Sequence, residues 1–155
     1  MKEENTLIIM KPDAVLRNLL GEIIGRFERK GLKIIGLKMM ELGDVLIETH
    51  YAHHKDKAFF GSLKRYMQSS PVVAMVLSGV NAVSATRLIV GPTKGYEADA
   101  VSIRGDFSIS GQTNIVHASD SVQNAEEEIA RFFSKNELFE YRRLDYQFIY
   151  GEDER

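Results

Sequence analysis

With 155 residues and a net charge of −2, the chain has the size of one domain and no excess of positive charge for nucleic acid or an anionic membrane. It contains no cysteine, which excludes disulfides and thiolate-bound metals and fits a reducing compartment. The first residues do not resemble a signal peptide and no apolar run is long enough to span a bilayer, so we expect a cytoplasmic protein without a membrane segment.

The first elements along the chain are a buried strand and an amphipathic helix. The compact apolar run at residues 6–10 predicts the strand, and Pro12 prevents it from continuing. Lys11 therefore lies at the carboxyl end of a strand. Apolar residues at helical spacing between 19 and 27 predict the helix, with Gly31 as its C-cap.

The alternation of strands and helices continues through the middle of the chain. The pattern predicts a strand at 33–40, a helix from 44 to about 54, a helix at 60–67, a strand at 72–77 and a helix at 81–90. Ile35, Leu37 and Met39 share one face of the strand at 33–40. Asp44 and Asn81 are suitable N-caps for the helices that they begin.

Residues 91–114 show no sustained period, and a loop of that length inside a compact domain usually carries function. A short strand follows and reaches His117, after which Ser119, Asp120 and Ser121 supply N-cap residues for a helix at 122–133. Near the end, Tyr146, Phe148 and Tyr150 alternate like an extended arm. The order of elements predicts an α/β sandwich with helices covering one face of a sheet.

His117 stands where a strand passes into a helix, so its side chain can face a cleft beside a helix N-terminus. Glu126 and Glu128 flank the apolar stripe of the following helix on opposite sides, and either can reach inward. A carboxylate that binds one ring nitrogen fixes the histidine tautomer and leaves the other nitrogen free to attack. Periodicity alone does not choose between the two glutamates, and a lone histidine is more often structural than catalytic.

A set of polar side chains lies where the predicted elements do not need it: Lys11, Arg87, Thr93, Arg104 and Asn114. Three cations and two hydrogen-bonding groups in a protein of net charge −2 are what an anion site requires. Phe59 lies outside the apolar stripe of its helix. It can stack on a nucleotide base, although simple packing is the more common role of such a residue.

Two other patterns give weaker indications. Residues 31–38 resemble a phosphate-binding loop, but Leu37 occupies the position of its lysine and the stretch alternates like a strand. His50, His53 and His54 have helical spacing, yet no acidic or cysteine partner is patterned beside them to complete a zinc site. We interpret these histidines as a solvated helix face.

The segment Asn-Ile-Val-His-Ala-Ser-Asp-Ser at residues 114–121 resembles the active-site signature of nucleoside diphosphate kinases, N-x-x-H-G-S-D. The similarity continues in family order at residues 11–15, 26–33, 50–51, 57–60, 70–75, 103–107 and 125–129. It extends over roughly residues 5 to 140, and the combined set is highly specific.

The resemblance implies a ferredoxin-like βαββαβ fold with a four-stranded antiparallel sheet covered by helices. It implies one domain over residues 1–155, with a C-terminal arm from about 138 to 155. The implied reaction moves the γ-phosphoryl group from a nucleoside triphosphate to a nucleoside diphosphate by a ping-pong route through a phosphohistidine. Mg²⁺ is expected on the nucleotide phosphates rather than on protein ligands. Residues 147–150 resemble the tail of hexameric members, which favours a homohexamer over a tetramer.

The resemblance also implies residue roles. His117 matches the nucleophile, Glu128 the carboxylate that orients it, and Lys11 a further catalytic group. Phosphate and ribose contacts match Lys11, Tyr51, Arg87, Thr93, Arg104 and Asn114, the base-stacking aromatic matches Phe59, and supporting residues match Ser119 and Asp120.

The chain departs from the family pattern at four positions. Ala118 replaces the usual glycine after the histidine, and it fits if the backbone φ is negative there. Gly111 replaces a bulkier apolar residue opposite Phe59, which predicts a looser clamp on the base. Gly95 and Ala100 stand where prolines are common in a loop that contacts other subunits, which predicts a less stable assembly.

Two functions other than the kinase are compatible with this fold. One is a catalytically idle regulatory or nucleic-acid-binding module on the same fold. The complete set of catalytic residue types and the lack of a basic stripe argue against it. The other is phosphorylation of proteins from the same phosphohistidine, which the sequence leaves open as a side activity.

Overall fold

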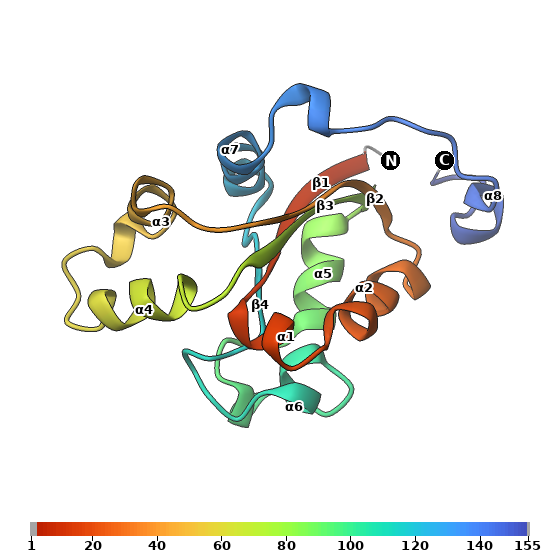
Figure 1. Cartoon of the computed structure of the whole chain (residues 1–155). Helices are drawn as coiled ribbons and strands as arrows, with labels where there is room; N and C mark the ends of the chain where they lie inside the picture. Colours follow the sequence, from red (N-terminus) through yellow and green to blue (C-terminus); the bar gives the residue numbers. More distant parts are fainter. Residues whose placement is uncertain (1–2, 155) are drawn as a thin grey trace.

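The computed structural model describes residues 3–154, so Met1, Lys2 and Arg155, at the ends of the predicted domain and arm, lie outside it. Its four strands form one antiparallel sheet in the order β2-β3-β1-β4 (Figure 1). They are β1 (Glu3–Met10), β2 (Lys33–Met40), β3 (Val72–Val80) and β4 (Val116–Ala118). The expected four-stranded antiparallel sheet of a ferredoxin-like α+β fold is therefore present.

The helices of the described chain differ widely in length. The helices with seven or more residues are α2 (Leu20–Arg29), α3 (Asp44–His50), α4 (Phe60–Met67), α5 (Ala82–Val90) and α7 (Val122–Phe132). The shorter ones are α1 (Pro12–Leu16), α6 (Ile103–Phe107), α8 (Tyr146–Ile149) and the 3₁₀ turns Ala52–His54, Gly95–Glu97 and Lys135–Glu137. Within residues 3–154, no helix has the length and apolar character needed to cross a membrane.

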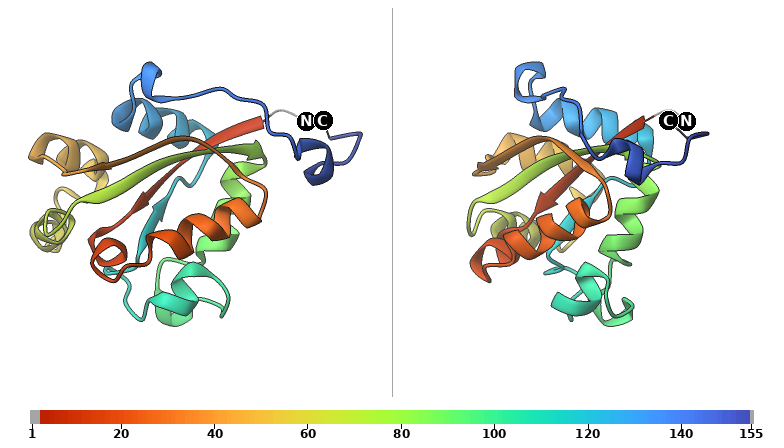
Figure 2. Two further views of the ribbon diagram at one scale, coloured as in Figure 1. Left: turned by 45° about the vertical axis from the view of Figure 1, so that its right-hand side comes forward. Right: turned by 90° about the vertical axis from the view of Figure 1, so that its right-hand side faces the viewer.

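Helices cover both faces of the sheet, which corrects the expectation of one covered face. Along β1, Leu7 and Ile9 pack into a cluster with α3, α4 and α7, whereas Ile8 and Met10 pack into a cluster with α2 and α5. The views in Figure 2 show the sheet between these two sets of helices. The reason is visible in the sequence, because a central strand buried on both faces is a continuous apolar run rather than an alternating one.

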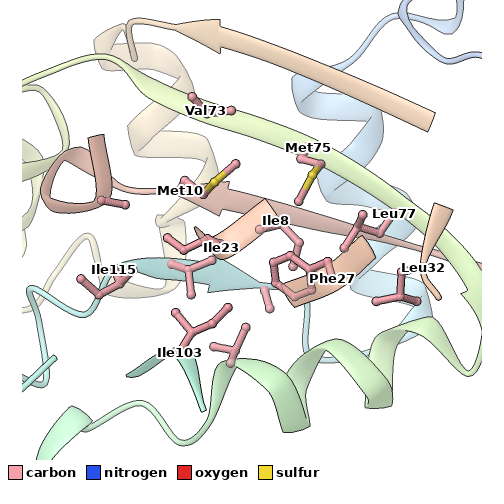
Figure 3. Close-up of a cluster of buried hydrophobic side chains, with 14 of the residues drawn as sticks. Ile8, Met10, Ile23, Phe27, Leu32, Val73, Met75, Leu77, Ile103 and Ile115 are labelled. Atoms are coloured by element: carbon pink, nitrogen blue, oxygen red, sulfur yellow. The ribbon is translucent and has the colours of Figure 1, made fainter. Parts of the chain in front are cut away.

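The cluster beneath α2 and α5 forms the larger part of the core and holds β1 in place. Phe27 and Ile23 from α2 lie against Met75 and Leu77 of β3 and Ile8 of β1 (Figure 3). All five side chains have no solvent exposure. Truncation of a buried aromatic such as Phe27 to alanine costs about 3–5 kcal/mol in proteins generally. This packing fixes the carboxyl end of β1, where Lys11 follows.

The loop between α5 and β4 is folded against itself rather than irregular throughout. It contains the 3₁₀ turn Gly95–Glu97 and α6. Gly95 donates its N–H to Ser110 O at 3.1 Å, and a Cβ built on Gly95 would lie 2.3 Å from Ser108 O. A proline at position 95 would lose that hydrogen bond and clash with the backbone. The glycine is thus required by the local packing of this chain.

The C-terminal segment runs from α7 across β2 to α8 (Figure 1). Phe139 N–H bonds to Ile35 O at 2.8 Å, and the Arg143 guanidinium bonds to Gly31 O at 2.7 Å. The predicted extended conformation at Tyr146 to Tyr150 is wrong, because α8 forms there. A four-residue helix has too little periodicity to be read from sequence, and tertiary contacts decide its conformation.

The cap predictions had different outcomes. The prediction of Asp44 as an N-cap is wrong, because Gly43 holds the N-cap position of α3 and Asp44 lies in the first turn. Of the three candidates Ser119, Asp120 and Ser121, it is Ser121 that caps α7, because its Oγ accepts the Asn124 N–H at 3.1 Å. Asn81 precedes α5 but adopts a left-handed backbone with φ of 54° and forms no side-chain cap.

On β2, Leu37 and Met39 pair with Met75 and Val73 and share a face as expected, and they remain 51% and 58% exposed. The placement of Ile35 on that face is wrong, because the register shifts between Ile34 and Gly36 and Ile35 packs against the cluster on the opposite face.

Candidate active site

The sheet itself directs His117 toward the α3–α7 face. His117 of β4 pairs with Ile9 of β1, and cross-strand partners in an antiparallel pair point to the same side. Ile9 belongs to the cluster that packs against α3, α4 and α7, whereas Val116 and Ala118 belong to the opposite cluster. The imidazole of His117 is 22% exposed, so it is held by packing and still open to a ligand.

Glu128 on α7 is the carboxylate that contacts the histidine. His117 Nε2 lies 3.0 Å from both Glu128 oxygens, and Ser119 Oγ donates to Oε2 at 2.6 Å. Burial acts to raise the Glu128 pKa, but the hydrogen bond and charge of His117 and the hydrogen bond of Ser119 outweigh it and lower the pKa to about 2. Glu128 is therefore ionised and engages Nε2, which leaves Nδ1 for another partner. Glu126 is exposed on another face of the helix.

Lys11 supplies a buried amine at the end of β1. Its side chain is 7% exposed, and its Nζ donates to Asn114 Oδ1 at 2.6 Å. Burial, followed by the positive charge of Arg104, lowers the Lys11 pKa to about 8. Asn114 is held in turn by its own amide, which donates to Thr93 O at 2.7 Å and Gly111 O at 3.0 Å. This network joins the strand end to the long loop.

Arg104 holds the surrounding backbone in place and also supplies a positive charge to the site. Its guanidinium donates to the carbonyls of Gly91 at 2.9 Å, Asn114 at 3.2 Å and Val116 at 2.6 Å. These bonds engage three of the five N–H donors of the group and leave two for an anion. Burial, followed by the nearby Arg87, lowers the Arg104 pKa to about 10, so the group stays charged at neutral pH.

A cleft of about 690 Å³ brings most of the predicted site residues together. Those that line it are Lys11, Tyr51, Arg87, Thr93, Arg104, Asn114, His117, Asp120 and Glu128. Two predicted residues do not line it. Ser119 is fully buried behind Glu128, and Phe59 is 44% exposed with its ring 5.2 Å from the ring of His54, which does line the cleft.

The Tyr51 hydroxyl is buried, and no hydrogen-bond partner for it exists among residues 3–154. Burial, with the negative charge of Glu128, raises the Tyr51 pKa, so the hydroxyl remains a donor. A buried polar group without a partner is costly and indicates a place where a ligand completes the bonding.

Asp120 is oriented at the rim, where its carboxylate accepts the Asn124 amide at 2.6 Å.

Sequence reasoning missed Asp13, which supports the site from behind. Asp13 is 8% exposed, and its carboxylate accepts the Ile115 N–H at 2.9 Å and the Tyr66 hydroxyl at 2.5 Å. Ile115 has φ of 72°, a strained conformation for a β-branched residue. Lys11 N–H donates to Ile115 O at 2.9 Å. The signal available in the sequence was an acid placed directly after Lys11-Pro12.

The interpretation of His50 as part of a solvated helix face is wrong, because its side chain is buried. Its ring lies 4.7 Å from that of His117 in an edge-to-face arrangement, and its Nδ1 is 3.3 Å from Arg131 Nη1. Burial, followed by the charge of His117, lowers the His50 pKa to about 3. His53 is exposed and His54 half-buried, as expected of residues at a helix end.

The departures at Ala118 and Gly111 can be assessed from the backbone. Ala118 lies in β4 and is not among the described residues with positive φ, so the expectation that alanine fits there is confirmed. A Cβ built on Gly111 would meet only Lys94 Cγ, at 3.6 Å. The space beside Gly111 is open, and the looser clamp stays a prediction.

Known proteins share this arrangement of sequence and fold. The family model described as nucleoside diphosphate kinase matches residues 4–138. A nucleoside diphosphate kinase of Archaeoglobus fulgidus is 49% identical over 149 residues, which is 96% of this chain and 99% of that protein. One from Methanobrevibacter smithii is 48% identical over 147 residues, covering 95% of this chain and 98% of that protein.

The agreement extends to solved structures. A halophilic nucleoside diphosphate kinase from Halobacterium salinarum, solved in complex with CDP, superposes with a TM-score of 0.94 at 39% identity and covers 97% of this chain and 100% of its own. A family protein from Babesia bovis superposes with a TM-score of 0.91 at 41% identity over 95% and 99% of the two chains. The chain belongs to the nucleoside diphosphate kinase family.

Proposed function

We propose that the protein transfers the γ-phosphoryl group of a nucleoside triphosphate to a nucleoside diphosphate through a phosphohistidine at His117. The observation that carries this proposal is the pairing of His117 Nε2 with the ionised Glu128 inside a cleft walled by cations. Membership of the kinase family supports it independently.

In the first half-reaction, Nδ1 of His117 attacks the γ-phosphorus of the donor. An N–P bond forms, the bond from phosphorus to the bridging oxygen breaks, and the nucleoside diphosphate leaves with that oxygen. Glu128 accepts the hydrogen bond from Nε2–H and stabilises the positive charge that develops on the ring. A second nucleoside diphosphate reverses the step and restores neutral His117.

Lys11, Arg87 and Arg104 neutralise the charge that spreads over the phosphoryl oxygens. The carboxylates that line the cleft are Asp120, Glu127 and Glu128, and Glu128 is already engaged by His117 and Ser119. This donor set fits a Mg²⁺ ion carried on the nucleotide phosphates, with water completing its oxygen shell, rather than a protein-held ion. Such an ion would supply further charge neutralisation.

The nucleoside end of the substrate lies toward Phe59. Its half-exposed ring can stack on any base, because every base has a π-face, so we expect broad base tolerance. Tyr51, Thr93 and Asn114 supply hydrogen-bonding groups for phosphate and ribose. The CDP bound to the halobacterial relative is consistent with a nucleotide in this cleft.

Members of this family form oligomers, and we propose a hexamer for this chain. The C-terminal segment supports it, because Leu144 and Phe148 are 90% and 82% exposed in the single chain and large apolar side chains on an arm favour subunit contacts.

A cytoplasmic location stays a prediction of the sequence. Neither the comparisons nor the cleft favours a catalytically idle or nucleic-acid-binding module.

The decisive experiment is incubation of the protein with γ-labelled ATP and Mg²⁺. We expect an acid-labile, base-stable phosphoprotein that added GDP discharges. The variant His117→Ala should take up no label, whereas His53→Ala, a matched change at an exposed histidine, should be labelled normally. Undiminished label on His117→Ala would refute the proposed nucleophile.

The role of Glu128 is tested by Glu128→Gln. The amide keeps the shape but loses the charge that stabilises the developing imidazolium, so phosphorylation should slow by roughly 10²–10⁴-fold, the usual range for loss of such assistance. ADP affinity, measured by calorimetry, should stay nearly unchanged. Unchanged turnover would show that another group orients His117.

A further inference from the structure

A metal-ligand set lies inside the cleft, on residues that the phosphoryl relay uses only in part. His50, His117 and Glu128 each offer one ligand atom, and these atoms lie within 4.8 Å of one another. His117 Nε2 is 3.0 Å from Glu128 Oε1, and His50 Nδ1 is 3.9 Å from the same oxygen. Zinc bonds of about 2.0–2.2 Å separate tetrahedral ligands by about 3.3–3.5 Å. The two measured separations bracket this spacing.

His50 is buried among the rings of Tyr51, His117 and Phe132. Its side chain is 2% exposed, and in the described part of the chain its Nε2 has no hydrogen-bond partner. The ring nitrogen that faces Glu128 is Nδ1, and its neighbours are the Glu128 carboxylate at 3.9 Å and the Arg131 guanidinium at 3.3 Å. The ring also lies edge-to-face against His117, so His50 stands at the reacting histidine without taking part in the relay.

We propose that His50, His117 and Glu128 form a binding site for a borderline divalent metal of the Zn²⁺ class, and that its occupation blocks phosphoryl transfer. Two imidazoles and one carboxylate, with a fourth position open to water, are a donor set that zinc accepts. Mg²⁺ prefers oxygen ligands, so the ion that accompanies the nucleotide does not compete for this site. The binding half of the proposal is independent of the proposed function, whereas the blocking half rests on it.

Blocking follows from the atoms that the metal would take. When His117 Nε2 coordinates the metal, the neutral ring carries its single proton on Nδ1 instead of Nε2. Nδ1 then has no free lone pair with which to attack phosphorus. At the same time Glu128 becomes a metal ligand and no longer stabilises a developing imidazolium.

Arg131 gives the proposal an opposing test. Its Nη1 lies 3.3 Å from His50 Nδ1, which places a fixed positive charge beside the ligand set. This cation disfavours a bound dication and must move when His50 Nδ1 coordinates. Removal of the charge in Arg131→Gln should therefore tighten metal binding, whereas removal of a ligand in His50→Gln should weaken it.

The experiment titrates Zn²⁺ into the nucleotide-free full-length chain by calorimetry in excess Mg²⁺, and follows Co²⁺ coordination by its visible absorption. We expect one Zn²⁺ per chain and at least about tenfold weaker binding in His50→Gln, because even changes behind a ligand cost that much. Arg131→Gln should bind more tightly. His53→Gln, at the neighbouring exposed histidine, should bind like the unmodified protein.

Several outcomes would overturn the proposal. Absence of a saturable Zn²⁺ site would refute it, and equal losses in His50→Gln and His53→Gln would assign the metal to surface histidines. Thermal denaturation shows whether His50→Gln is folded. If it is not, unchanged or weaker Zn²⁺ binding in Arg131→Gln would refute the site instead. Zn²⁺ binding without loss of phosphoprotein formation would refute the blocking half. Failure of ATP labelling in metal-free protein would instead contradict the proposed function and leave the calorimetry unaffected.

Discussion

At the scale of single residues, the site depends on residues held in energetically unfavourable environments or conformations. Lys11 is an amine buried among other cations, and Ile115 is a β-branched residue with positive φ. Each is tied to a neighbour, Lys11 to Asn114 and Ile115 to Asp13. Such strain persists only where the surrounding structure over-determines it, and it accumulates at functional sites.

The lowered pKa of Lys11 predicts a pH dependence of nucleotide affinity. Burial brings the pKa of Lys11 to about 8 from its usual value of 10.5, and a bound polyphosphate favours the charged amine. ADP affinity should therefore fall as pH rises through about 8. Calorimetric titration of ADP across this range checks it. Lys11→Met should bind more weakly and lack this step, and a step of the same size in the variant would assign it to another group.

The lowered pKa of Lys11 also makes the free energy of unfolding depend on pH in a defined direction. Between pH about 8 and 10.5 the unfolded chain holds a proton on Lys11 that the folded chain has released. Because the unfolded state binds more protons, the contribution of Lys11 to the free energy of unfolding rises with pH in this window. Burying this cation thus costs stability near neutral pH, a cost that binding of an anion offsets.

Asp13 should prove to be a positioning residue. Asp13→Ala leaves the buried Ile115 N–H without an acceptor, which we expect to cost about 1–3 kcal/mol of stability and to lower kcat/KM. Asp13→Asn keeps an oxygen for that N–H and should retain most of both. Denaturant unfolding and steady-state kinetics of the pair decide the matter. Equal effects of the two substitutions would mean that the charge, not the hydrogen bond to Ile115, is what matters.

At the scale of elements, periodicity located the regular pieces well. The strand at 33–40 and the helix at 60–67 have the predicted bounds, because each has enough residues to express its period. The short helices α1, α6 and α8 were missed. Helices of five residues or fewer are not stable by themselves, so the contacts of the folded chain decide whether they form.

Gly31 links α2 to the C-terminal helix and provides a test of this packing. Its φ is 97°, and an added Cβ would lie 2.8 Å from Ile149 Cγ2. Gly31→Ala should destabilise the protein by about 1–2 kcal/mol through the backbone alone. Gly21→Ala in α2, where a Cβ meets nothing within 4 Å, should be stabilising by about 0.5–1 kcal/mol. Thermal unfolding compares them, and similar melting temperatures would contradict the strain at Gly31.

At the scale of the whole molecule, the C-terminal arm is the part whose large apolar side chains stay exposed in a single chain. Phe148→Asp puts a charge on an arm residue that is 82% exposed in the single chain. If the arm makes subunit contacts, the variant should form a smaller assembly while each subunit stays folded. Light scattering measures the mass, and circular dichroism the fold. Val45→Asp on α3, at 81% exposure, is the matched control, and loss of mass in both variants would point to a general effect of charge.

The sequence by itself determined the strands and longer helices, the family resemblance and the residue types around His117, because apolar periodicity and motif spacing are properties of the chain. Periodicity left Glu126 and Glu128 open, the family resemblance selected Glu128, and the structure places its carboxylate 3.0 Å from His117. Only the tertiary structure decided that Arg104 uses three donors on carbonyls and that His50 and Asp13 stand behind the site. The physical reason is that these contacts join residues on different elements. Their distances depend on sheet pairing and on the packing of helices against both faces.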